Sequence, residues 1–331
     1  MIDPAALLAL IDRFAGRAAL VVGDVILDEY LIGRATRLSR EAPIPVVEFE
    51  RREVIPGGAA NPAANLAALG CHVTQIGVIG TDPNGETLRG LLAGRGIDPD
   101  GLVVDAGRPT ITKTRIMAQM GLRYPQQVAR LDRLDRSPIR GAVQTAAVGQ
   151  FAARIGAVRA ALFSDYLNGL LTPETVREMA AIGRESGAFL AADSQGDLDK
   201  YAEFDCVKCN ADEAERYLGR PLRTEADFTA AAEQIAGRLA VRRAIMITRG
   251  AEGITLAGPE GAAHVRAPKV EDVFDTVGAG DTVLAVAALG LLVGGSAVQA
   301  AGLAVHAAGI VIRRVGNYTP SPDELRSAVR G

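Results

Sequence analysis

The chain has 331 residues, of which 48% are hydrophobic and 23% are charged. These values are typical of a folded globular protein, and they exclude disordered, collagen-like and small disulfide-stapled proteins. The formal net charge is −3, so the chain lacks a strong basic field for nucleic acid or an anionic membrane. Three cysteines are too few, and odd in number, for a disulfide framework, which favours a reducing, cytoplasmic location.

Short apolar segments rich in β-branched residues alternate with helical patterns along the chain. The predicted buried strands are residues 18–27, 73–79, 160–163, 188–192, 206–208 and 244–248. The predicted helices are residues 63–69, 86–93 and 226–239, and a helix that follows an N-cap at Thr172. The alternation predicts one α/β domain over residues 1–331, with a doubly wound, mostly parallel sheet and ligands at the carboxyl ends of its strands.

This alternation is interrupted at residues 29–53 and 110–132. In these two segments polar residues alternate with residues that favour β-strands. They predict solvent-facing strands that leave the core and pair into a small β-sheet, placed over the site as a lid.

Residues 282–312 contain no Asp, Glu, Lys or Arg and are nominally long enough to cross a bilayer. Gly294, Gly295 and Ser296 interrupt this segment, and each half is shorter than the ~20 residues that a span needs. We therefore predict two buried helices and no membrane span. The acidic start of the chain also lacks the features of a secretory signal.

The segment directly before this apolar region, residues 275–282, carries the most chemical information. Backbone N–H groups of Gly278, Ala279 and Gly280 at a helix N-terminus favour an anion such as a transferring phosphoryl group. Asp281 beside them can accept a proton from an attacking hydroxyl group. The alternative is a glycine-rich turn in which Asp281 only caps the helix.

Two further groups predict contacts with a polyol. Gly57 and Gly58 allow close backbone approach to a ligand before a predicted helix, and Asn61 offers both a donor and an acceptor. Asp24 and Asp28 follow the first strand, where carboxylates can accept hydrogen bonds from sugar hydroxyl groups. The alternatives are a tight turn with Asn61 as its N-cap, and a pair of ordinary turn aspartates.

Loops after two later strands carry weaker signals. Asn210 and Glu213 can hold a hydrated Mg²⁺ through its waters, and a turn with Thr248, Gly250 and Gly253 can line a nucleotide phosphate. Taken alone, each of these signals is better explained by helix caps and turn glycines.

Several other functions are disfavoured. The chain has no G-x-x-x-x-G-K-[ST] run and no G-x-G-x-x-G after the first strand, which argues against a P-loop enzyme and a dinucleotide oxidoreductase. Cys206 and Cys209 have C-x-x-C spacing but lie in an apolar strand pattern without a second cysteine pair, so we interpret them as buried apolar residues.

From Leu20 to Leu325 the chain resembles the ribokinase (PfkB-type) family of carbohydrate kinases. Residues 57–61 and 275–282 match the two signatures of that family in the right order. Within the family, the branch that acts on D-glycero-β-D-manno-heptose 7-phosphate is most similar, through residues 22–28, 39–47, 112–115, 126–132 and 164–166.

This resemblance implies a ribokinase-like fold and a kinase that uses ATP and Mg²⁺. It implies transfer of the γ-phosphoryl group to the anomeric hydroxyl of the heptose 7-phosphate, a step toward ADP-heptose and lipopolysaccharide. It also implies a cytoplasmic homodimer whose lids pack together. The matching positions are the base Asp281; the anion hole Gly278, Ala279 and Gly280; the sugar contacts Asp28, Gly57, Gly58 and Asn61; the Mg²⁺ segment Asn210 and Glu213; and the nucleotide loop Thr248, Gly250 and Gly253.

The sequence departs from the heptose kinases in places. Asp193-Ser194-Gln195-Gly196 stands where they usually read D-P-K-G, the lid hairpin is longer around residues 120–125, and Val277 and Asn317 are unusual at their positions. These departures leave open a family kinase for another sugar, sugar phosphate or nucleoside. A separate alternative is a non-catalytic sugar or nucleotide sensor on the same scaffold.

A 7-phosphate requires cations. The candidates are Lys113, Arg115 and Arg130. The alternative, of equal weight, is that these side chains are only solvent-exposed charges on the surface of the lid.

Overall fold

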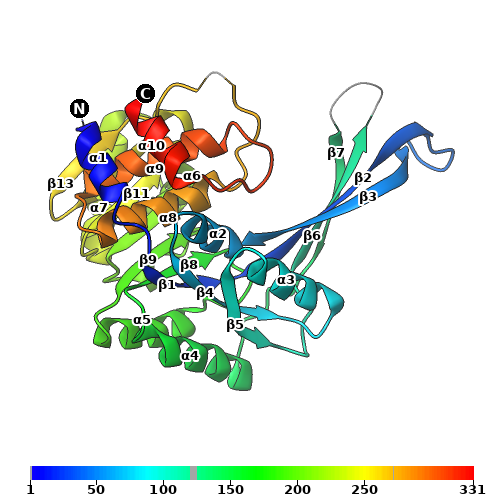
Figure 1. Ribbon diagram of the computed structural model, residues 1–331, viewed down its shortest axis with the longest axis horizontal. Helices are drawn as coiled ribbons and strands as arrows, with labels where there is room; N and C mark the ends of the chain where they lie inside the picture. The colour runs from blue at the N-terminus through cyan, green and yellow to red at the C-terminus, as the bar shows by residue number, and fades with distance from the viewer. Residues whose placement is uncertain (1, 120–124, 271) are drawn as a thin grey trace.

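The computed structural model describes residues 2–119, 125–270 and 272–331 (Figure 1). Among these residues a nine-stranded sheet has the order β13-β12-β11-β10-β9-β8-β1-β4-β5, in which only β12 and β13 run antiparallel to their neighbours. The prediction of a doubly wound, mostly parallel sheet is confirmed. Its strands are β1 (Ala18–Gly23), β4 (His72–Ile79), β5 (Ile97–Val104), β8 (Ala160–Asp165), β9 (Phe189–Ser194), β10 (Cys206–Asn210), β11 (Ala244–Thr248), β12 (Ile254–Gly258) and β13 (Gly261–Val265).

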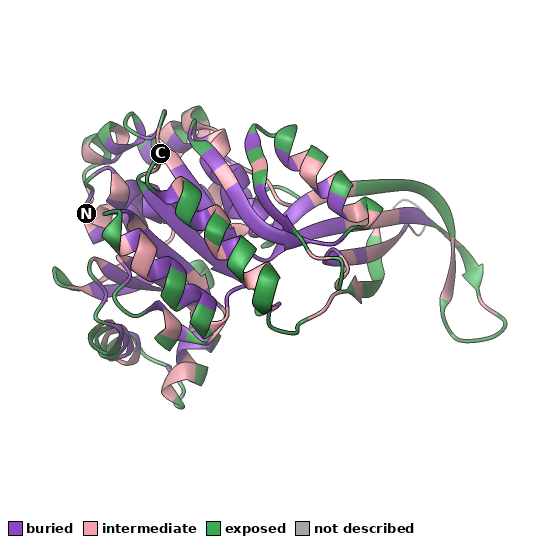
Figure 2. Ribbon diagram, turned by 90° about the horizontal axis from the view of Figure 1, so that it is seen from below, coloured by how far each residue is buried: buried purple, intermediate pink, exposed green. Residues whose placement is uncertain are grey.

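Helices cover both faces of this sheet (Figure 2). One face is covered by α1 (Pro4–Ile11), α2 (Ala60–Ala68), α3 (Pro83–Ala93), α8 (Ala279–Leu292), α9 (Ala297–Val311) and α10 (Pro322–Arg330). The other is covered by α4 (Gly141–Ile155), α5 (Pro173–Glu185), α6 (Ala211–Leu218) and α7 (Glu225–Leu239). As predicted, the Thr172 hydroxyl caps α5 by accepting from the N–H of Thr175.

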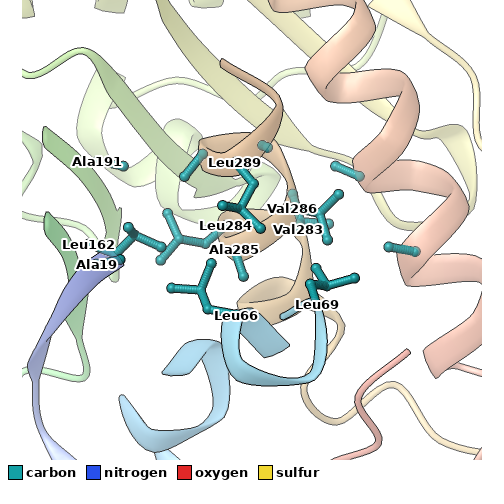
Figure 3. Packing of buried hydrophobic residues seen from close by; sticks show 14 of the residues in the cluster. Ala19, Leu66, Leu69, Leu162, Ala191, Val283, Leu284, Ala285, Val286 and Leu289 are labelled. Carbon is teal, nitrogen blue, oxygen red and sulfur yellow. The ribbon is translucent and has the colours of Figure 1, made fainter. Parts of the chain in front are cut away.

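The predicted pair of apolar helices is confirmed as α8 and α9. Figure 3 shows Leu284 and Ala285 of α8 packed near Leu66, Ala19 and Leu162, in the core between α8, α2 and the main sheet. Fully burying an aliphatic side chain of this size stabilises a fold by roughly 1.5–3 kcal/mol. Nothing in the described part of the chain is both long and apolar enough, as a helix, to span a membrane.

The two segments that leave the core form a second sheet, as predicted, with the strand order β3-β2-β6-β7. We call this sheet the lid; it projects from the main body as a long ribbon (Figure 1). Its strands are β2 (Val25–Leu38), β3 (Pro45–Gly58), β6 (Thr112–Gln119) and β7 (Gln126–Arg133). Of the lengthened hairpin at residues 120–125, residues 120–124 lie outside the described part.

The prediction of one strand over residues 18–27 was wrong, because the chain changes sheets at Asp24. β1 ends at Gly23 in the main sheet, and β2 begins at Val25 in the lid. The buried Asp24 carboxylate accepts N–H groups of Tyr166, Asn168 and Leu170. The apolar pattern continues across this junction because residues on both sides are buried, and that continuity conceals the break.

Candidate active site

The glycine-rich segment forms the N-terminus of α8, at the carboxyl edge of the main sheet. Gly278 has φ +80°, and a Cβ there would lie 2.5 Å from Asn61 Nδ2, so the position requires glycine. The N–H groups of Gly278, Gly280 and Asp281 donate no hydrogen bond within the described residues, whereas Ala279 donates to Thr276 O at 3.3 Å. Free amides at a helix N-terminus are suited to an anion.

Asp281 lies directly beside these amides. It is the third residue of α8 and Gly278 is the N-cap, so the interpretation of Asp281 as a capping residue was wrong. Its buried carboxylate accepts from Asn61 Nδ2 at 2.9 Å and from the Tyr166 hydroxyl at 2.9 and 3.0 Å. Burial, together with the nearby Asp193 charge, raises the pKa of Asp281 to about 7. A carboxylate with this pKa is well matched to a general base near neutral pH.

Asn61 is the second residue of α2, whose N-cap is Ala59, so the capping interpretation of Asn61 was also wrong. This placement directs the Asn61 amide to Asp281. The Asn61 backbone carbonyl accepts from Asn65, which is itself an acceptor for the Thr282 hydroxyl. A network of buried hydrogen bonds therefore joins the two glycine-rich segments that the sequence singled out.

The predicted sugar-binding residues lie where β2 and β3 leave the main body. Asp28 is buried; it accepts from Arg115 at 2.6 Å and from Asn317 Nδ2 at 3.4 Å. A Cβ on Gly57 would lie 2.0 Å from Asp28 Oδ2, so glycine leaves the space that this carboxylate occupies. Asp24, by contrast, is fully engaged with backbone N–H groups and acts as a structural anchor.

Two of the three lid cations reach this region. Lys113 Nζ lies 5.5 Å from the centre of the Tyr166 ring, and burial lowers the pKa of Lys113. Arg115 pairs with Asp28. Arg130, paired with Arg115 in the β6–β7 register, is exposed and donates to Asp132.

Sequence reasoning noted Tyr166 only as part of the loop at residues 164–166, without a role of its own, and it did not single out Lys208. Lys208 is buried in β10 and donates to both oxygens of Asp193, at 2.9 and 2.8 Å. A Cβ on Gly280 would lie 3.0 Å from Lys208 Nζ, so the ammonium group lies against the N-terminus of α8. Burial alone would lower the pKa of Lys208, but the charge and hydrogen bonds of Asp193 have the larger effect, so the pKa is raised. A lone lysine inside an apolar strand pattern was the signal that could have revealed this pair.

A cavity of about 330 Å³ opens on the other side of the α8 N-terminus. Thr248, Gly250 and Gly253 line it, as does Gly280. The rest of its wall is largely apolar, with Val270, Val273, Val283, Val305 and Ile312. An apolar cleft beside free helix amides suits a ligand with a flat apolar part and an anionic tail.

Asn210 and Glu213 begin α6 with a reciprocal capping box. The Asn210 side chain accepts from the N–H of Glu213, and the Glu213 carboxylate accepts from the N–H of Asn210 at 2.6 Å. Glu213 Oε1 has no hydrogen-bond partner among the described residues, and no cluster of three or more metal-binding side chains occurs among them. Any metal here must take most of its ligands from water or substrate.

Comparison with known proteins agrees with this architecture. The model of the pfkB family carbohydrate kinases matches residues 18–324. Proteins named bifunctional protein HldE from Geobacter metallireducens and Citrifermentans bemidjiense are 41% and 40% identical over 308 and 320 residues. These matches cover 93% and 96% of this chain but 62% and 64% of the relatives, so the chain spans less than two thirds of their length.

Solved structures show the same fold. A putative ribokinase from Agrobacterium tumefaciens superimposes with a TM-score of 0.75 and 21% identity, covering 96% of this chain and 98% of the other. Arabidopsis thaliana ribokinase complexed with ribose and ATP gives 0.74 and 19%, covering 96% and 99%. The fold and the match over nearly the whole chain lead to one conclusion: the chain belongs to the pfkB family of carbohydrate kinases, which are ATP-dependent phosphotransferases.

Proposed function

We propose that the chain phosphorylates the anomeric hydroxyl of D-glycero-β-D-manno-heptose 7-phosphate with ATP, in the cytoplasm, on the route to ADP-heptose. The observation that carries the proposal is the buried Asp281 carboxylate next to free N–H groups at the N-terminus of α8. Identity of about 40% to proteins named HldE supports the choice of the heptose phosphate.

In the proposed reaction the acceptor oxygen attacks the γ-phosphorus of ATP, its proton passes to Asp281, and ADP leaves. The α8 amides stabilise charge on the transferring phosphoryl group because they are fixed in place before the reaction. The nucleotide base is assigned to the cavity lined by Thr248, Gly250 and Gly253. The sugar is assigned to the opposite side, beside Asp28 and Asn61.

Mg²⁺ is proposed to act with ATP near Asn210 and Glu213. Oxygen donors suit this ion, and Mg²⁺ commonly takes one carboxylate, several waters and substrate phosphates. Glu213 Oε1 is available for such a role through water, while Oε2 holds the N-terminus of α6. When bound, the ion would neutralise part of the phosphate charge.

Lys113 is the favoured contact for the 7-phosphate. Arg115 is already neutralised by Asp28, and Arg130 by Asp132, whereas no carboxylate lies within ion-pair distance of Lys113 among the described residues. An unpaired, half-buried cation gains more from a phosphate than a cation that must first break an ion pair.

The proposed substrate is tested by ADP release from Mg·ATP with the heptose 7-phosphate, beside ribose, fructose, fructose 6-phosphate, sedoheptulose 7-phosphate and adenosine. We expect turnover of the heptose phosphate at a kcat/KM at least about 10²-fold above the others, since a site with paired polar groups strongly rejects a ligand that lacks their partners. Preferential turnover of another acceptor would keep the kinase and reject the heptose. If the folded protein binds ATP but releases no ADP with any of these acceptors, the result would favour a non-catalytic sugar or nucleotide sensor.

We further propose a homodimer formed through the lid. Leu31, Ile44, Val47, Phe49 and Ile116 line a hollow in the lid, and Phe49 and Ile44 are 66% and 57% exposed. A contiguous exposed apolar surface of this kind is typical of an interface.

We expect Phe49→Asp to convert a dimer into a monomer in sedimentation velocity, because the change buries an unpaired charge at the contact. Leu38→Asp, which alters another exposed lid residue, is the comparison. A monomeric parent protein at micromolar concentration would reject the dimer.

A further inference from the structure

We propose that Tyr166 is a positioning residue for phosphoryl transfer: its phenol orients the Asp281 carboxylate so that Oδ1 faces the acceptor hydroxyl, and Asp24 fixes the segment that carries Tyr166. This inference deepens the proposed function and rests on Asp281 as the base. Tyr166 lies in the loop after β8, and the sequence motifs gave it no such role.

The two carboxylate oxygens of Asp281 are not equivalent. Oδ2 accepts from Asn61 Nδ2 and from the Tyr166 hydroxyl, at 2.9 and 3.0 Å. Within the described residues Oδ1 accepts only from the same hydroxyl, at 2.9 Å. A phenol has one proton, so the two Tyr166 contacts share a single donor. Oδ1 therefore keeps the greater capacity to accept a hydrogen bond, and it is the atom assigned to receive the proton of the acceptor.

Tyr166 donates its hydroxyl proton to the ionised Asp281 carboxylate. Burial raises the pKa of Tyr166 well above its usual value, and the Asp281 charge raises it further. The phenol consequently keeps its proton while Asp281 alternates between its ionised and protonated forms. In the proposed cycle the acceptor's O–H bond breaks, a new O–H bond forms at Asp281 Oδ1, and the Tyr166 O–H bond remains intact.

Asp24 holds the backbone that places this phenol. Its carboxylate accepts from the N–H groups of Tyr166, Asn168 and Leu170, at 3.1, 3.0 and 3.3 Å. Leu167, between these contacts, has φ +55°, a left-handed conformation that a leucine adopts only when its surroundings enforce it. A side chain at the junction between the main sheet and the lid thus controls the loop that carries Tyr166.

The lid touches the same phenol. Lys113 of β6 lies with its ammonium group 5.5 Å from the centre of the Tyr166 ring, within cation–π range. The contacts run without a break from the lid through Tyr166 to Asp281. A sugar phosphate bound by Lys113 would therefore lie against the residue that orients the base.

The proton affinity of Asp281 depends on groups from every element around it. Asp193 of β9 raises its pKa, whereas Lys208 of β10, Asn61 of α2 and Tyr166 each lower it. Tyr166 lowers the pKa because its hydrogen bond stabilises the carboxylate over the acid. Removing this phenol while leaving the other groups in place must shift the titration of Asp281 upward.

The test is Tyr166→Phe, which removes only the hydroxyl group. We expect the acid limb of the pH profile of kcat/KM, near pH 7 in the parent protein, to move up by about one pH unit, the typical effect of a hydrogen bond to a charged group. At pH 7 we expect kcat to fall about 10-fold, with part of the loss recovered above pH 8. Tyr217→Phe, which removes a hydroxyl that contacts Asp199 far from the base, is the matched control.

A substrate-free measurement separates this inference from the proposed function. ¹³C NMR titration of the Asp281 carboxyl, assigned through the Asp281→Asn variant, should show the same upward shift in Tyr166→Phe even if no tested sugar is a substrate. Asp24→Asn, which keeps one acceptor oxygen for the loop, should shift the titration in the same direction by a smaller amount. An unchanged Asp281 titration in folded Tyr166→Phe would overturn the inference.

Discussion

Asp281→Asn is expected to lower kcat by about 10²–10⁴-fold, the typical contribution of a positioned general base, while the protein remains folded. The amide keeps the size of the carboxylate and an oxygen that accepts from Asn61 and Tyr166, but it cannot take a proton from the acceptor. The measurement is ADP release under saturating ATP and sugar phosphate. Asp272→Asn, an exposed change in the preceding segment, is the control that should leave kcat unchanged.

The same variant should be more stable than the parent protein at pH 8. Burial and Asp193 raise the pKa of Asp281 to about 7 in the folded protein, against an ordinary value of 3.8. The folded state therefore binds more protons than the unfolded state between these values, and its stability falls as the pH rises through this window.

Removing the charge in Asp281→Asn should raise the free energy of unfolding by about 2–4 kcal/mol at pH 8. This difference between the two proteins should vanish below about pH 4. Urea titrations of both proteins at the two pH values measure it. A kcat within a few-fold of the parent, or a lower stability at pH 8, would contradict the role assigned to this carboxylate.

Lys208→Met is expected to destabilise the protein by about 3–5 kcal/mol, because it leaves the Asp193 carboxylate buried without its partner. In the parent protein the Lys208 ammonium donates to both oxygens of Asp193, and the two side chains are 7% and 14% exposed. Urea denaturation measures the change. Lys269→Met, at an exposed position, is the control.

The double variant Lys208→Met with Asp193→Leu should recover much of this loss, because it replaces a buried pair by apolar groups. It should not recover kcat, since the ammonium group that lies against the α8 N-terminus is gone. A Lys208→Met variant with parent stability would contradict the pairing.

The ion pair between Lys208 and Asp193 also explains how the site can lack a lysine in the segment at residues 193–196, at the end of β9. Asp193-Ser194-Gln195-Gly196 has no lysine at the position where the resemblance to the heptose kinases leads us to expect one. Lys208, on the adjacent strand β10, places a cation at the α8 N-terminus instead. The departure in sequence therefore does not remove positive charge from this part of the site.

The fold was largely predictable from the sequence because most of its determinants are local. Buried parallel strands have continuous apolar patterns. Helix boundaries are also marked locally, by the N-cap Thr172 before α5 and by residues 294–296 before α9. The change of sheet at Asp24 was not predictable, because its cause is a set of hydrogen bonds to residues more than 140 positions away. The starts of α2 and α3 were predicted three residues late, because their first turns are rich in small and polar residues, which give weak apolar periodicity.

The candidate site was partly predictable for the same reason. Gly278, Gly280 and Asp281 are adjacent in sequence, so their joint chemistry is visible in the motif. Tyr166 and Lys208 come from separate loops and strands, and only the fold brings them to Asp281 and Gly280. Pairing also decides which charges are available: the sequence could not tell that Arg115 is engaged with Asp28 while Lys113 has no carboxylate partner in the described part.

The most direct test of the central claim is a crystal structure of the protein with a non-hydrolysable ATP analogue, Mg²⁺ and the heptose 7-phosphate. The account predicts the anomeric hydroxyl about 2.6–3.2 Å from Asp281 Oδ1, with the γ-phosphate on the free amides of Gly278, Gly280 and Asp281. An anomeric hydroxyl out of reach of Asp281, with the γ-phosphate away from the α8 N-terminus, would contradict it.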